Sequence, residues 1–431
     1  MLWGITRYQW TVLFAAWLGW GFDIFDSLLF NYVAPNCIPA LLHLPPGSAE
    51  AKQATIYWTG LITSLLLVGW AAGGVLFGRV CDRIGRMRTL MLTMALYAVG
   101  TAACAFAPNL WALVAFRLLA SLGIGGEWAA GAAMVAEAMP EKRRIEAGAL
   151  LYTAAPFGLF LATWLNFQVA GVWFPADPER SWRYLFLFGL LPAVAAFAVR
   201  FFLHEPERWQ SAVQRRRARI ADLFRPEFRG TTLRGTFVVL VALATWWTCN
   251  AFIPTLATGL ARAEAERRAL DRGATLALVE HWKLVAMVAF NSGGLLGTLL
   301  TIPLGHRMNR RPMFALYFVA GAAAIFANFG LDLPPETRLY MFFLIGVPVF
   351  GVFGAFPYYL PELFPTWLRA TGAGFCYNIG RVLAAVGVFA VGAAASRGIA
   401  SQVIFYVGFV PLVGALLSPL FLETRGKPLV D

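Results

Sequence analysis

Long apolar runs alternate along the chain with short polar segments that are rich in arginine. A helix needs about 20 predominantly apolar residues to cross a bilayer, and twelve runs reach that length. An even number of crossings returns both termini to the same side. The pattern therefore predicts an all-α membrane protein with twelve transmembrane helices. The runs cover 10–34, 54–78, 88–107, 110–138, 147–170, 183–203, 234–260, 280–303, 313–331, 338–361, 370–396 and 400–422.

The longest polar stretch, 204–233, divides these runs into two sets of six. Four of its arginines lie between positions 215 and 219. We interpret this stretch as a solvated linker on the inner face, within reach of anionic lipid, in preference to a regulatory or partner-binding segment. The expected domains are a six-helix bundle at 1–203, the cytoplasmic linker at 204–233 and a second six-helix bundle at 234–431.

The composition excludes several classes of protein. Of the 431 residues, 59% are apolar and 13% are charged, whereas soluble domains run at about 45–50% and about 25%. Such a chain cannot cover itself with polar surface, which excludes an ordinary soluble enzyme, a disordered protein and the usual nucleic-acid binder. The five cysteines and four histidines are scattered, without the spacing of a zinc site or a disulfide framework. We expect no metal, no cofactor and no nucleic-acid partner.

The net charge of +12 is spread unevenly over the loops. One set of loops, with the termini and the linker, holds 23 of the 35 lysines and arginines, and the opposite set holds 10. Because cytoplasmic loops carry the excess of basic residues, we expect both termini in the cytoplasm. The excess of arginine over lysine and the abundant alanine favour a bacterial source, and hence the bacterial inner membrane.

Two loop patterns of the first half of the chain recur in the second half, at nearly the same distance along the sequence. The segment 78–86 matches 305–311 at an offset of 227, and 137–144 matches 362–369 at an offset of 225. In the second pair, Glu precedes Pro by three residues and Arg follows Pro by four. Repeats of this kind are typical of transporters, whose substrate sites lie near the midplane between the halves. We therefore predict two duplicated six-helix halves.

The same segments resemble the signature motifs of the major facilitator superfamily. The loop 78–86 is similar to that family's Gly-x-x-x-Asp-Arg-x-Gly-Arg loop, and Arg117 with the run 123–127 resembles its fourth-helix motif. The segments 205–208 and 422–427 are similar to motifs of the sugar-porter and organic-anion branches. The resemblance covers the whole chain and implies two pseudo-symmetric six-helix bundles that work by alternating access.

The arginine-rich loops predict a gate on the inner face. Each short loop carries one acid, so the loops can form ion pairs, and Asp82 and Glu137 can each face the positive N-terminus of a neighbouring helix. Such contacts would hold the halves together in one conformation and break in the other. The alternative is that the arginines only fix topology. The candidate gate residues are Gly78, Asp82, Arg83, Arg86, Glu137, Arg144, Glu205, Arg208, Glu362, Arg369 and Glu423.

Three ionisable residues inside the first and fourth spans predict a proton-coupling site. A charge at mid-bilayer costs at least about 2.5–3.5 kcal/mol. At about 1.5 Å per residue, Asp23 and Arg117 lie at matching depths in a core of about 30 Å, and Asp26 shares the face of Asp23. Two carboxylates beside one guanidinium cannot both stay cheaply ionised, so one of them would carry a proton. The alternative is a structural ion pair that fixes helix packing.

Two further charges lie within predicted spans. Glu127 is nearer the cytoplasm and is either a second proton site or a gate partner. Arg381 lies near the midplane of the eleventh span, with no acid near the midplane in its own half, which favours bidentate recognition of a carboxylate. The resemblance implies the same role, because the organic-anion branch has an anion-binding arginine at the equivalent place. The alternative is pairing with Asp23 or Asp26 across the halves.

Several polar and aromatic residues are expected to line the cavity beside Arg381. A side-chain amide in lipid needs a partner, so the asparagines are the stronger candidates, whereas aromatic residues in spans serve packing more often than ligand contact. These candidates are Trp246, Trp247, Asn250, Asn291, Tyr358, Tyr377 and Asn378.

These features predict a transporter and not an enzyme, since no catalytic motif is visible. The first hypothesis is a proton-coupled symporter of a small, monocarboxylate-like organic anion, because moving a proton with a monocarboxylate transfers no net charge. The acidic first-helix run 21–26 resembles that of the sialate, lactate and aromatic-acid symporters. The alternatives are a sugar or polyol symporter and a proton-driven exporter of drugs or metabolites. The expected partners are the anion, protons and the lipid bilayer, and we expect the protein to function as a monomer.

Overall fold

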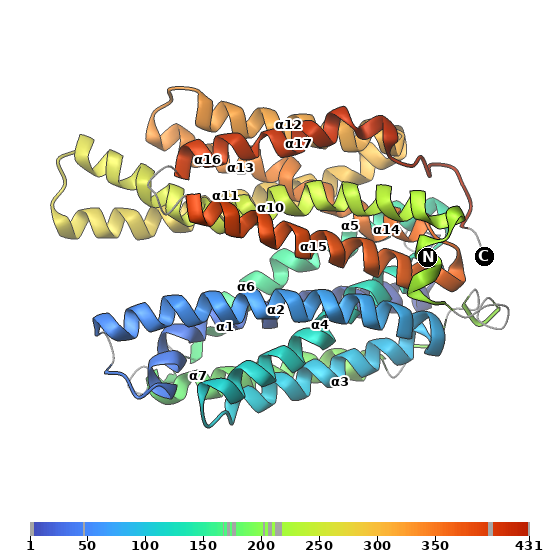
Figure 1. Cartoon of the computed structure of the whole chain (residues 1–431), viewed down its shortest axis with the longest axis horizontal. Coiled ribbons are helices and arrows are strands. Elements are labelled where there is room, and N and C mark those ends of the chain that lie inside the picture. The colour runs from blue at the N-terminus through green and yellow to red at the C-terminus, as the bar shows by residue number, and fades with distance from the viewer. Residues whose placement is uncertain are drawn as a thin grey trace. The chain divides into compact units, whose positions relative to one another are not determined.

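The structure is a computed structural model that describes residues 4–45, 48–166, 168–169, 173–174, 178–200, 203–205, 209–211, 218–394 and 400–429. Within these residues every regular element is a helix (Figure 1). In the first half of the chain the α-helices are α1 (Arg7–Leu41), α2 (Ala49–Ile84), α3 (Arg86–Ala105), α4 (Leu110–Ala138), α5 (Arg144–Tyr152), α6 (Ala154–Asn166), α7 (Pro178–Phe188) and α8 (Leu190–Arg200). In the second half they are α10 (Pro226–Arg267), α11 (Arg272–Arg307), α12 (Arg310–Gly330), α13 (Pro335–Gly351), α14 (Phe356–Glu362), α15 (Arg369–Ala394), α16 (Ala400–Val407) and α17 (Phe409–Leu416).

The helices form two compact units. Unit 1 comprises Met1–Arg225, Leu360–Asn378 and Pro428–Asp431, and unit 2 comprises Pro226–Tyr359 and Ile379–Lys427. The segment Leu360–Asn378 therefore packs with the helices of the first half, although it follows them by more than a hundred residues. The division of the chain into domains at 204–233 stays a prediction.

Local sequence signals explain where the helices begin. Thr6 forms a capping box at the start of α1, accepting a hydrogen bond from the backbone N–H of Gln9 and donating its own N–H to the Gln9 side chain. Ser48, Asn109 and Asp271 accept in the same way at the starts of α2, α4 and α11. These caps satisfy N–H groups that have no partner within the helix.

The apolar runs agree with the helices, with differences at their ends. Among the described residues, eight helices are long and apolar enough to cross a membrane, or nine if the two arms of α1, bent by 45°, make one span. The run 110–138 coincides with α4, but α10 and α11 extend well beyond the runs at 234–260 and 280–303. Among the remaining runs, 183–203 corresponds to α7 with α8, 370–396 to α15, and 400–422 to α16 with α17.

Small residues bring neighbouring helices of unit 1 close together. The helices α2, α3 and α4 run side by side (Figure 1). A side chain on Gly125 of α4 would overlap the backbone carbonyl of Trp70 on α2, and one on Gly100 of α3 would come within 2.6 Å of the backbone nitrogen of Ala120. At these two positions a larger residue would force the packed helices apart, so glycine permits their close approach.

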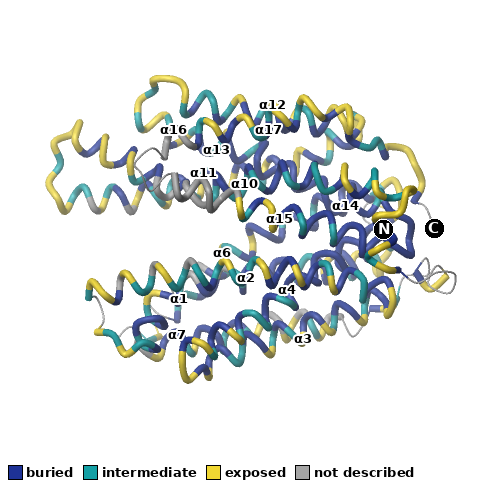
Figure 2. The backbone as a smooth tube through the Cα atoms, viewed as in Figure 1, coloured by how far each residue is buried: buried dark blue, intermediate teal, exposed yellow. Residues whose placement is uncertain are grey.

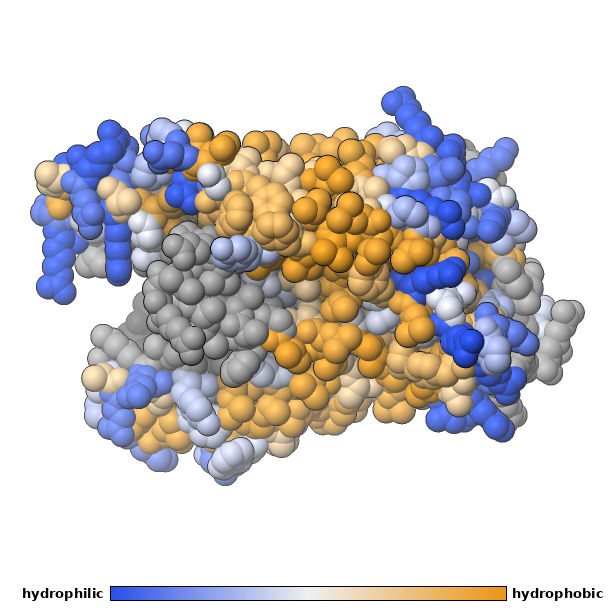
Figure 3. Space-filling model, turned by 45° about the horizontal axis from the view of Figure 1, so that its top comes forward, coloured by the Kyte–Doolittle hydropathy of each residue, from blue (hydrophilic) through white to orange (hydrophobic). Residues whose placement is uncertain are grey.

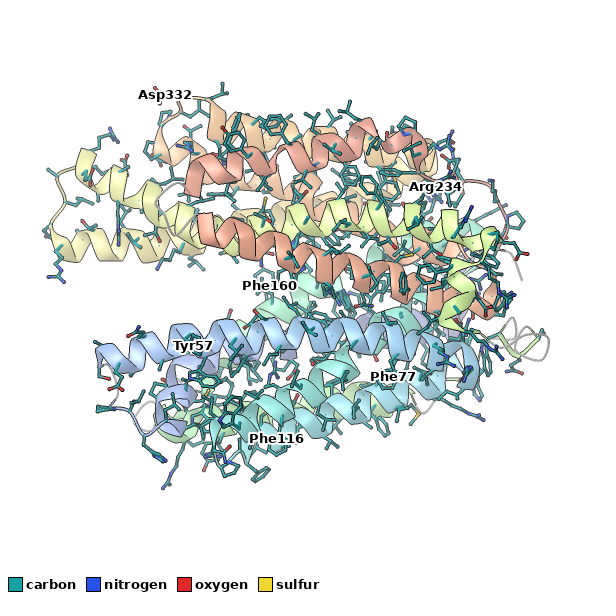
Figure 4. All side chains as sticks on the ribbon, viewed as in Figure 1. Tyr57, Phe77, Phe116, Phe160, Arg234 and Asp332 are labelled. Atoms are coloured by element: carbon teal, nitrogen blue, oxygen red, sulfur yellow. The ribbon has the colours of Figure 1, made fainter. Side chains whose placement is uncertain are left out.

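The distribution of side chains fits a membrane environment. Buried residues follow the sides of helices that face one another, while exposed residues gather at the turn between α10 and α11 (Figure 2). In both units hydrophobic side chains cover the middle of the helices and hydrophilic ones gather at their ends (Figure 3). Arg234 and Asp332 mark the opposite ends of unit 2, and Tyr57 and Phe77 lie toward opposite ends of α2 (Figure 4). The ends that carry the gate candidates are therefore the water-facing ends of the helices.

Candidate transport site and inner charge network

Four charged residues of unit 1, which we call the inner charge network, meet at the ends of four helices. They are Asp82 near the end of α2, Arg86 at the start of α3, Glu137 near the end of α4 and Arg369 at the start of α15. The guanidinium of Arg86 donates to Asp82 at 2.9 Å and to Glu137 at 2.7 and 3.0 Å, and that of Arg369 donates to Glu137 at 2.8 Å. All four are buried. Two positive and two negative charges thus neutralise one another away from water.

Asp82 also binds the start of α15. Its carboxylate accepts hydrogen bonds from the backbone N–H groups of Ala370 and Thr371, at 3.2 and 2.7 Å, and from the Thr371 hydroxyl at 2.7 Å. These N–H groups belong to the first turn of the helix, where the helix dipole favours negative charge. The structure thus confirms the predicted contact between Asp82 and a helix N-terminus.

The duplication is visible in a reciprocal pairing. Glu137 and Glu362 are equivalent at the offset of 225, as are Arg144 and Arg369. Glu137 pairs with Arg369 at 2.8 Å, and Glu362 lies 3.7 Å from Arg144. Each repeat thus supplies the acid for the arginine of the other, but the first pair is shorter and makes the stronger charge-assisted bond.

Two further acids each hold the start of a helix. In unit 1, Glu205 accepts from the backbone N–H groups of Arg86 and Arg88 at 2.7 and 3.2 Å, at the start of α3. In unit 2, Glu423 accepts from those of Arg310 and Arg311 at 3.0 and 3.3 Å, at the start of α12. The two acids follow the sixth and twelfth predicted spans, so they hold equivalent helices of the two repeats.

The remaining gate candidates lie around the network. A side chain on Gly78 would come within 2.7 Å of the carbonyl oxygen of Ala370, so this glycine permits close approach of α2 to α15. Arg83 is exposed and donates to the carbonyl of Ala218 at 3.2 Å. Arg208 lies outside the described residues.

Within the membrane-spanning part of unit 1, Arg117 of α4 forms an ion pair with Asp26 of α1. Its Nη1 lies 3.1 Å from the carboxylate, and its Nη2 donates to the Asp26 carbonyl at 3.2 Å. The hydroxyl of Thr101 on α3 donates to the same carboxylate at 2.8 Å. The guanidinium carbon lies 5.8 and 5.9 Å from the ring centres of Phe30 and Phe186. Of the predicted triad of Asp23, Asp26 and Arg117, the structure pairs Arg117 with Asp26; the role of the triad in proton coupling stays a prediction.

Two more acids of unit 1 are buried in helices. Asp23 lies on α1 one turn before Asp26 and has no exposed surface. Glu127 of α4 is buried and accepts a hydrogen bond from the hydroxyl of Thr93 on α3 at 3.1 Å. Both are therefore held inside the bundle, where an uncompensated charge is costly.

In unit 2 the candidate substrate residues lie on four helices, α10, α11, α14 and α15. Arg381 on α15 is buried, and the amide nitrogen of Asn291 on α11 donates to the carbonyl of Met287 at 2.8 Å. On α10, Trp246 and Trp247 are half-buried and meet edge to face at 4.9 Å between ring centres, and Asn250 is half-buried one turn later.

Tyr358 of α14 lies in different surroundings. Its ring is 4.7 Å from the guanidinium carbon of Arg310 at the start of α12, and its hydroxyl contacts the sulfur of Met313 at 3.5 Å. The cation–π contact ties this side chain to the end of unit 2 that carries Glu423.

The candidates Tyr377 and Asn378 of α15 belong to unit 1. The Tyr377 ring stacks on Trp128 of α4 with centres 4.1 Å apart, and its hydroxyl is 3.0 Å from that of Tyr152 on α5. The ring of Tyr152 lies 5.9 Å from that of Trp20 on α1. Asn378 donates its amide N–H to the carbonyl of Gly374 at 2.8 Å.

Sequence reasoning missed several of these partners. Thr101, Thr93, Trp20 and Trp128 carry no charge and lie in apolar runs, so no pattern separated them from packing residues. Tyr152 was detectable, because it is the equivalent of Tyr377 at the offset of 225. Among the described residues, no group of three or more histidines, cysteines and acids is arranged to hold a metal ion.

Comparison with known proteins agrees with this architecture. Residues 10–388 match the family model described as Major Facilitator Superfamily. The chain is similar to a probable 4-methylmuconolactone transporter of Cupriavidus pinatubonensis, with 29% identity over 88% of this chain and 82% of that one. It is also similar to a gentisate transporter of Corynebacterium glutamicum, with 26% identity over 96% of this chain and 88% of that one.

Among solved structures, the fold is similar to that of the proton:xylose symporter XylE bound to 6-bromo-6-deoxy-D-glucose. The TM-score is 0.75 at 17% identity, with 98% of each chain covered. At this identity the likeness shows the twelve-helix fold alone. With its family model matched over most of its length, the chain belongs to the major facilitator superfamily and is a membrane transporter of metabolites or organic acids, not an enzyme.

Proposed function

We propose that the protein is a proton-coupled symporter of a small organic anion in a bacterial inner membrane. The observation that carries the proposal is the burial of ionisable side chains within predicted spans, foremost the Asp26–Arg117 pair with Asp23 one turn away. Membrane-embedded acids are the usual carriers of protons in transporters. Symport of one proton with one monocarboxylate moves no net charge, so uptake would not work against the membrane potential.

The proton sites have distinct surroundings. The carboxylate of Asp26 is held by the ion pair with Arg117 and by the hydrogen bond from Thr101. Asp23 shares the helix face one turn away, so a second negative charge beside Asp26 is disfavoured. In this proposal Asp23 takes up and releases the proton while Asp26 stays paired, and Glu127 is a second candidate.

The anion contact in this proposal is Arg381. It is buried in α15, and guanidinium groups bind carboxylates through two parallel hydrogen bonds. The names of the relatives, a methylmuconolactone and a gentisate transporter, support an organic acid in preference to a sugar. Neither Asp23 nor Arg381 has a charged counterpart at the equivalent position of the other half. Residues of the shared scaffold are expected to recur in both halves, so these two charges fit a role in binding substrate or protons better than a role in holding the fold.

The experiment is transport by the protein in liposomes that contain a pH-sensitive dye. The panel is lactate, pyruvate, benzoate, sialate and glucose, each added outside. We expect acidification with at least one carboxylate, its loss in Arg381→Ala, and partial recovery in Arg381→Lys, which keeps the charge but not the paired donors. Arg234→Ala, at an exposed arginine of the same unit, serves as the control. Glucose uptake that survives Arg381→Ala would contradict the proposal in favour of a sugar symporter.

A second arm of the experiment tests proton coupling. Asp23→Asn should still exchange labelled substrate across the membrane but should no longer accumulate it in response to a pH gradient. Unchanged accumulation in this variant would move the proton site to Asp26 or Glu127. Substrate efflux driven by an inward proton gradient would instead favour an exporter.

The inner charge network fits a gate in this mechanism. It joins the first turn of α15 to α2, α3 and α4 through buried ion pairs and hydrogen bonds. Breaking these contacts frees α15 from the inner ends of the other helices. We propose that substrate transport alternates between states with and without these contacts.

A further inference from the structure

A group of five buried aromatic side chains lies in the middle of unit 1. The ring centres of Trp70 and Trp20 are 6.3 Å apart, those of Trp20 and Tyr152 5.9 Å, and those of Trp128 and Tyr377 4.1 Å. The hydroxyls of Tyr152 and Tyr377, 3.0 Å apart, join the two parts. All five are buried, and they come from five helices, α1, α2, α4, α5 and α15.

Two donors of this group have no acceptor within the part of the chain that the structure describes. The indole nitrogens of Trp20 and Trp128 are buried and have no hydrogen-bond partner among the described residues, and each tryptophan is only 3% exposed. Buried indole N–H groups usually find a partner, because an unsatisfied buried donor is costly. Two such donors beside the same pair of tyrosines therefore need an acceptor that the described residues do not supply.

The depth of the group matches a substrate site. Trp20 lies 13 residues beyond the start of α1 and Trp128 lies 10 residues before the end of α4, which corresponds to about 20 Å and about 15 Å of helix. In a hydrocarbon core of about 30 Å both positions are near the middle. Substrates of duplicated transporters bind near the midplane, where the repeats meet.

The tyrosine pair marks such a meeting place within unit 1. Tyr152 and Tyr377 are equivalent at the repeat offset of 225, yet they belong to the same unit and share a hydrogen bond. Tyr152 comes from the first repeat and Tyr377 from the second, so this hydrogen bond joins the two repeats. It does so beside the indoles of Trp20 and Trp128.

We propose that Trp20, Trp128, Tyr152 and Tyr377 form a subsite for the planar part of the substrate. A flat, unsaturated acid extends the Trp128–Tyr377 stack by lying on the outer face of Trp128, and the two indole N–H groups donate to its oxygen atoms. Aromatic faces and N–H donors suit a conjugated or aromatic carboxylate better than a saturated one. The subsite rests on the proposed transport of an organic anion and adds residues that select it, three from the first repeat and Tyr377 from the second.

The test compares benzoate with cyclohexanecarboxylate, its saturated counterpart, in the liposome assay. The wild-type protein should have the lower KM for benzoate. Trp20→Phe and Trp128→Phe keep an aromatic ring but lose the donor, so each should raise the KM for benzoate about tenfold, the effect of one lost hydrogen bond to a charged acceptor, with little change in maximal rate. Trp128→Leu also removes the stacking face and should abolish the preference for benzoate.

The control is Trp111→Phe, which alters a tryptophan on α4 that is 68% exposed and should leave both KM values unchanged. Size-exclusion profiles and melting temperatures establish that each variant is folded. Unchanged KM values in both Phe variants, with the preference retained in Trp128→Leu, would overturn the subsite while the transport proposal stands. A wild-type protein that moves no carboxylate would overturn both.

Discussion

Glu137 shows how a single side chain can join distant parts of the chain. Its carboxylate binds Arg86 and Arg369, which lie 51 and 232 residues away along the chain, at 2.7 and 2.8 Å. Both guanidinium groups are buried. Removing one member of a buried ion pair commonly costs about 3–5 kcal/mol, because the remaining charge is left uncompensated.

We therefore predict that Glu137→Gln weakens the inner charge network more than any exposed substitution. The amide keeps the shape but loses the charge, so Arg86 retains only Asp82 as an acidic partner in the network and Arg369 loses its own. Native Cys81 provides the measurement, because it is buried and its carbonyl accepts from Arg86 at 3.2 Å. Its labelling by a permeant maleimide, followed by peptide mass spectrometry, should become several-fold faster.

Glu141→Gln is the matched control, because the side chain of Glu141 is 53% exposed and surface ion pairs contribute little. Cys81 labelling equal to that of the wild-type protein in Glu137→Gln, at an unchanged melting temperature, would show that the network does not hold the inner end closed.

At the residue scale, charges were predictable and their neutral partners were not. The matching depths of Asp23 and Arg117, with Asp26 on the same face as Asp23, were enough to predict that acids of the first span meet Arg117, and Asp26 is the one that pairs with it. Thr101 and the unpartnered Trp20 and Trp128 emerged only from packing. A hydroxyl or an indole in an apolar run has no periodic signal that separates a ligand contact from a core residue.

At the scale of elements, acidic side chains from distant segments hold the starts of α3 and α12. The carboxylate of Glu423 is partly buried, which disfavours its charge, but the backbone N–H groups of Arg310, Arg425 and Arg311 outweigh burial and lower the pKa of Glu423 below its ordinary value. The ionised form is therefore bound more strongly in the folded protein than in the unfolded chain.

We predict that Glu423→Gln destabilises the protein by about 1–2 kcal/mol at neutral pH, the range for a charge at a helix N-terminus with hydrogen bonds. Because the folded pKa is lowered, the stabilisation is fully present above the ordinary pKa of glutamate. It is lost as the pH falls through the lowered value. The melting temperatures of wild type and variant should therefore converge in acid.

Glu205→Gln, at the equivalent helix start of unit 1, should give a loss of similar size, whereas Glu266→Gln, at an exposed position on α10, should give none. Equal melting temperatures for Glu423→Gln and wild type at neutral pH would contradict the assigned role of this carboxylate.

The apolar runs predicted the existence of the helices better than their ends. The run at 110–138 matches α4 because Asn109 caps its start and Pro140 follows its end. The helix α10 continues past its apolar run, since Glu264 pairs with Arg267 and Arg268 at 2.5 Å one turn apart. Such pairs stabilise a helix in water, and an apolar pattern does not detect them.

At the scale of the whole molecule, the repeats share their scaffold but not their membrane charges. Arg86, at the start of α3, donates to the carbonyl five residues before it at 3.2 Å, and Arg310, at the start of α12, does the same at 3.0 Å. By contrast, Asp26 and Arg117 have no charged equivalents in the second repeat. The two halves therefore share a scaffold but differ in their membrane charges. This difference fits the proposed symport, in which the first half binds the proton and the second half binds the anion.

The orientation in the membrane follows from the same loop charges and is directly testable. Arg234 and Asp332 lie at opposite ends of unit 2 (Figure 4), and both are exposed. Since the excess of basic residues stays in the cytoplasm, the end with Arg234 should face inward and the end with Asp332 outward. The five native cysteines are all buried, so single added cysteines can be followed against a low background.

We predict that Asp332→Cys reacts with a membrane-impermeant maleimide in intact spheroplasts, whereas Arg234→Cys reacts only in inside-out vesicles. Detergent-solubilised protein, in which both should react, controls for accessibility. The opposite pattern would reverse the topology, and the inner charge network would then close the outer face. Protons driven inward would in that case enter at the end that carries Asp82 and Arg86. The direction of coupling therefore depends on which water-facing end the arginine-rich loops occupy.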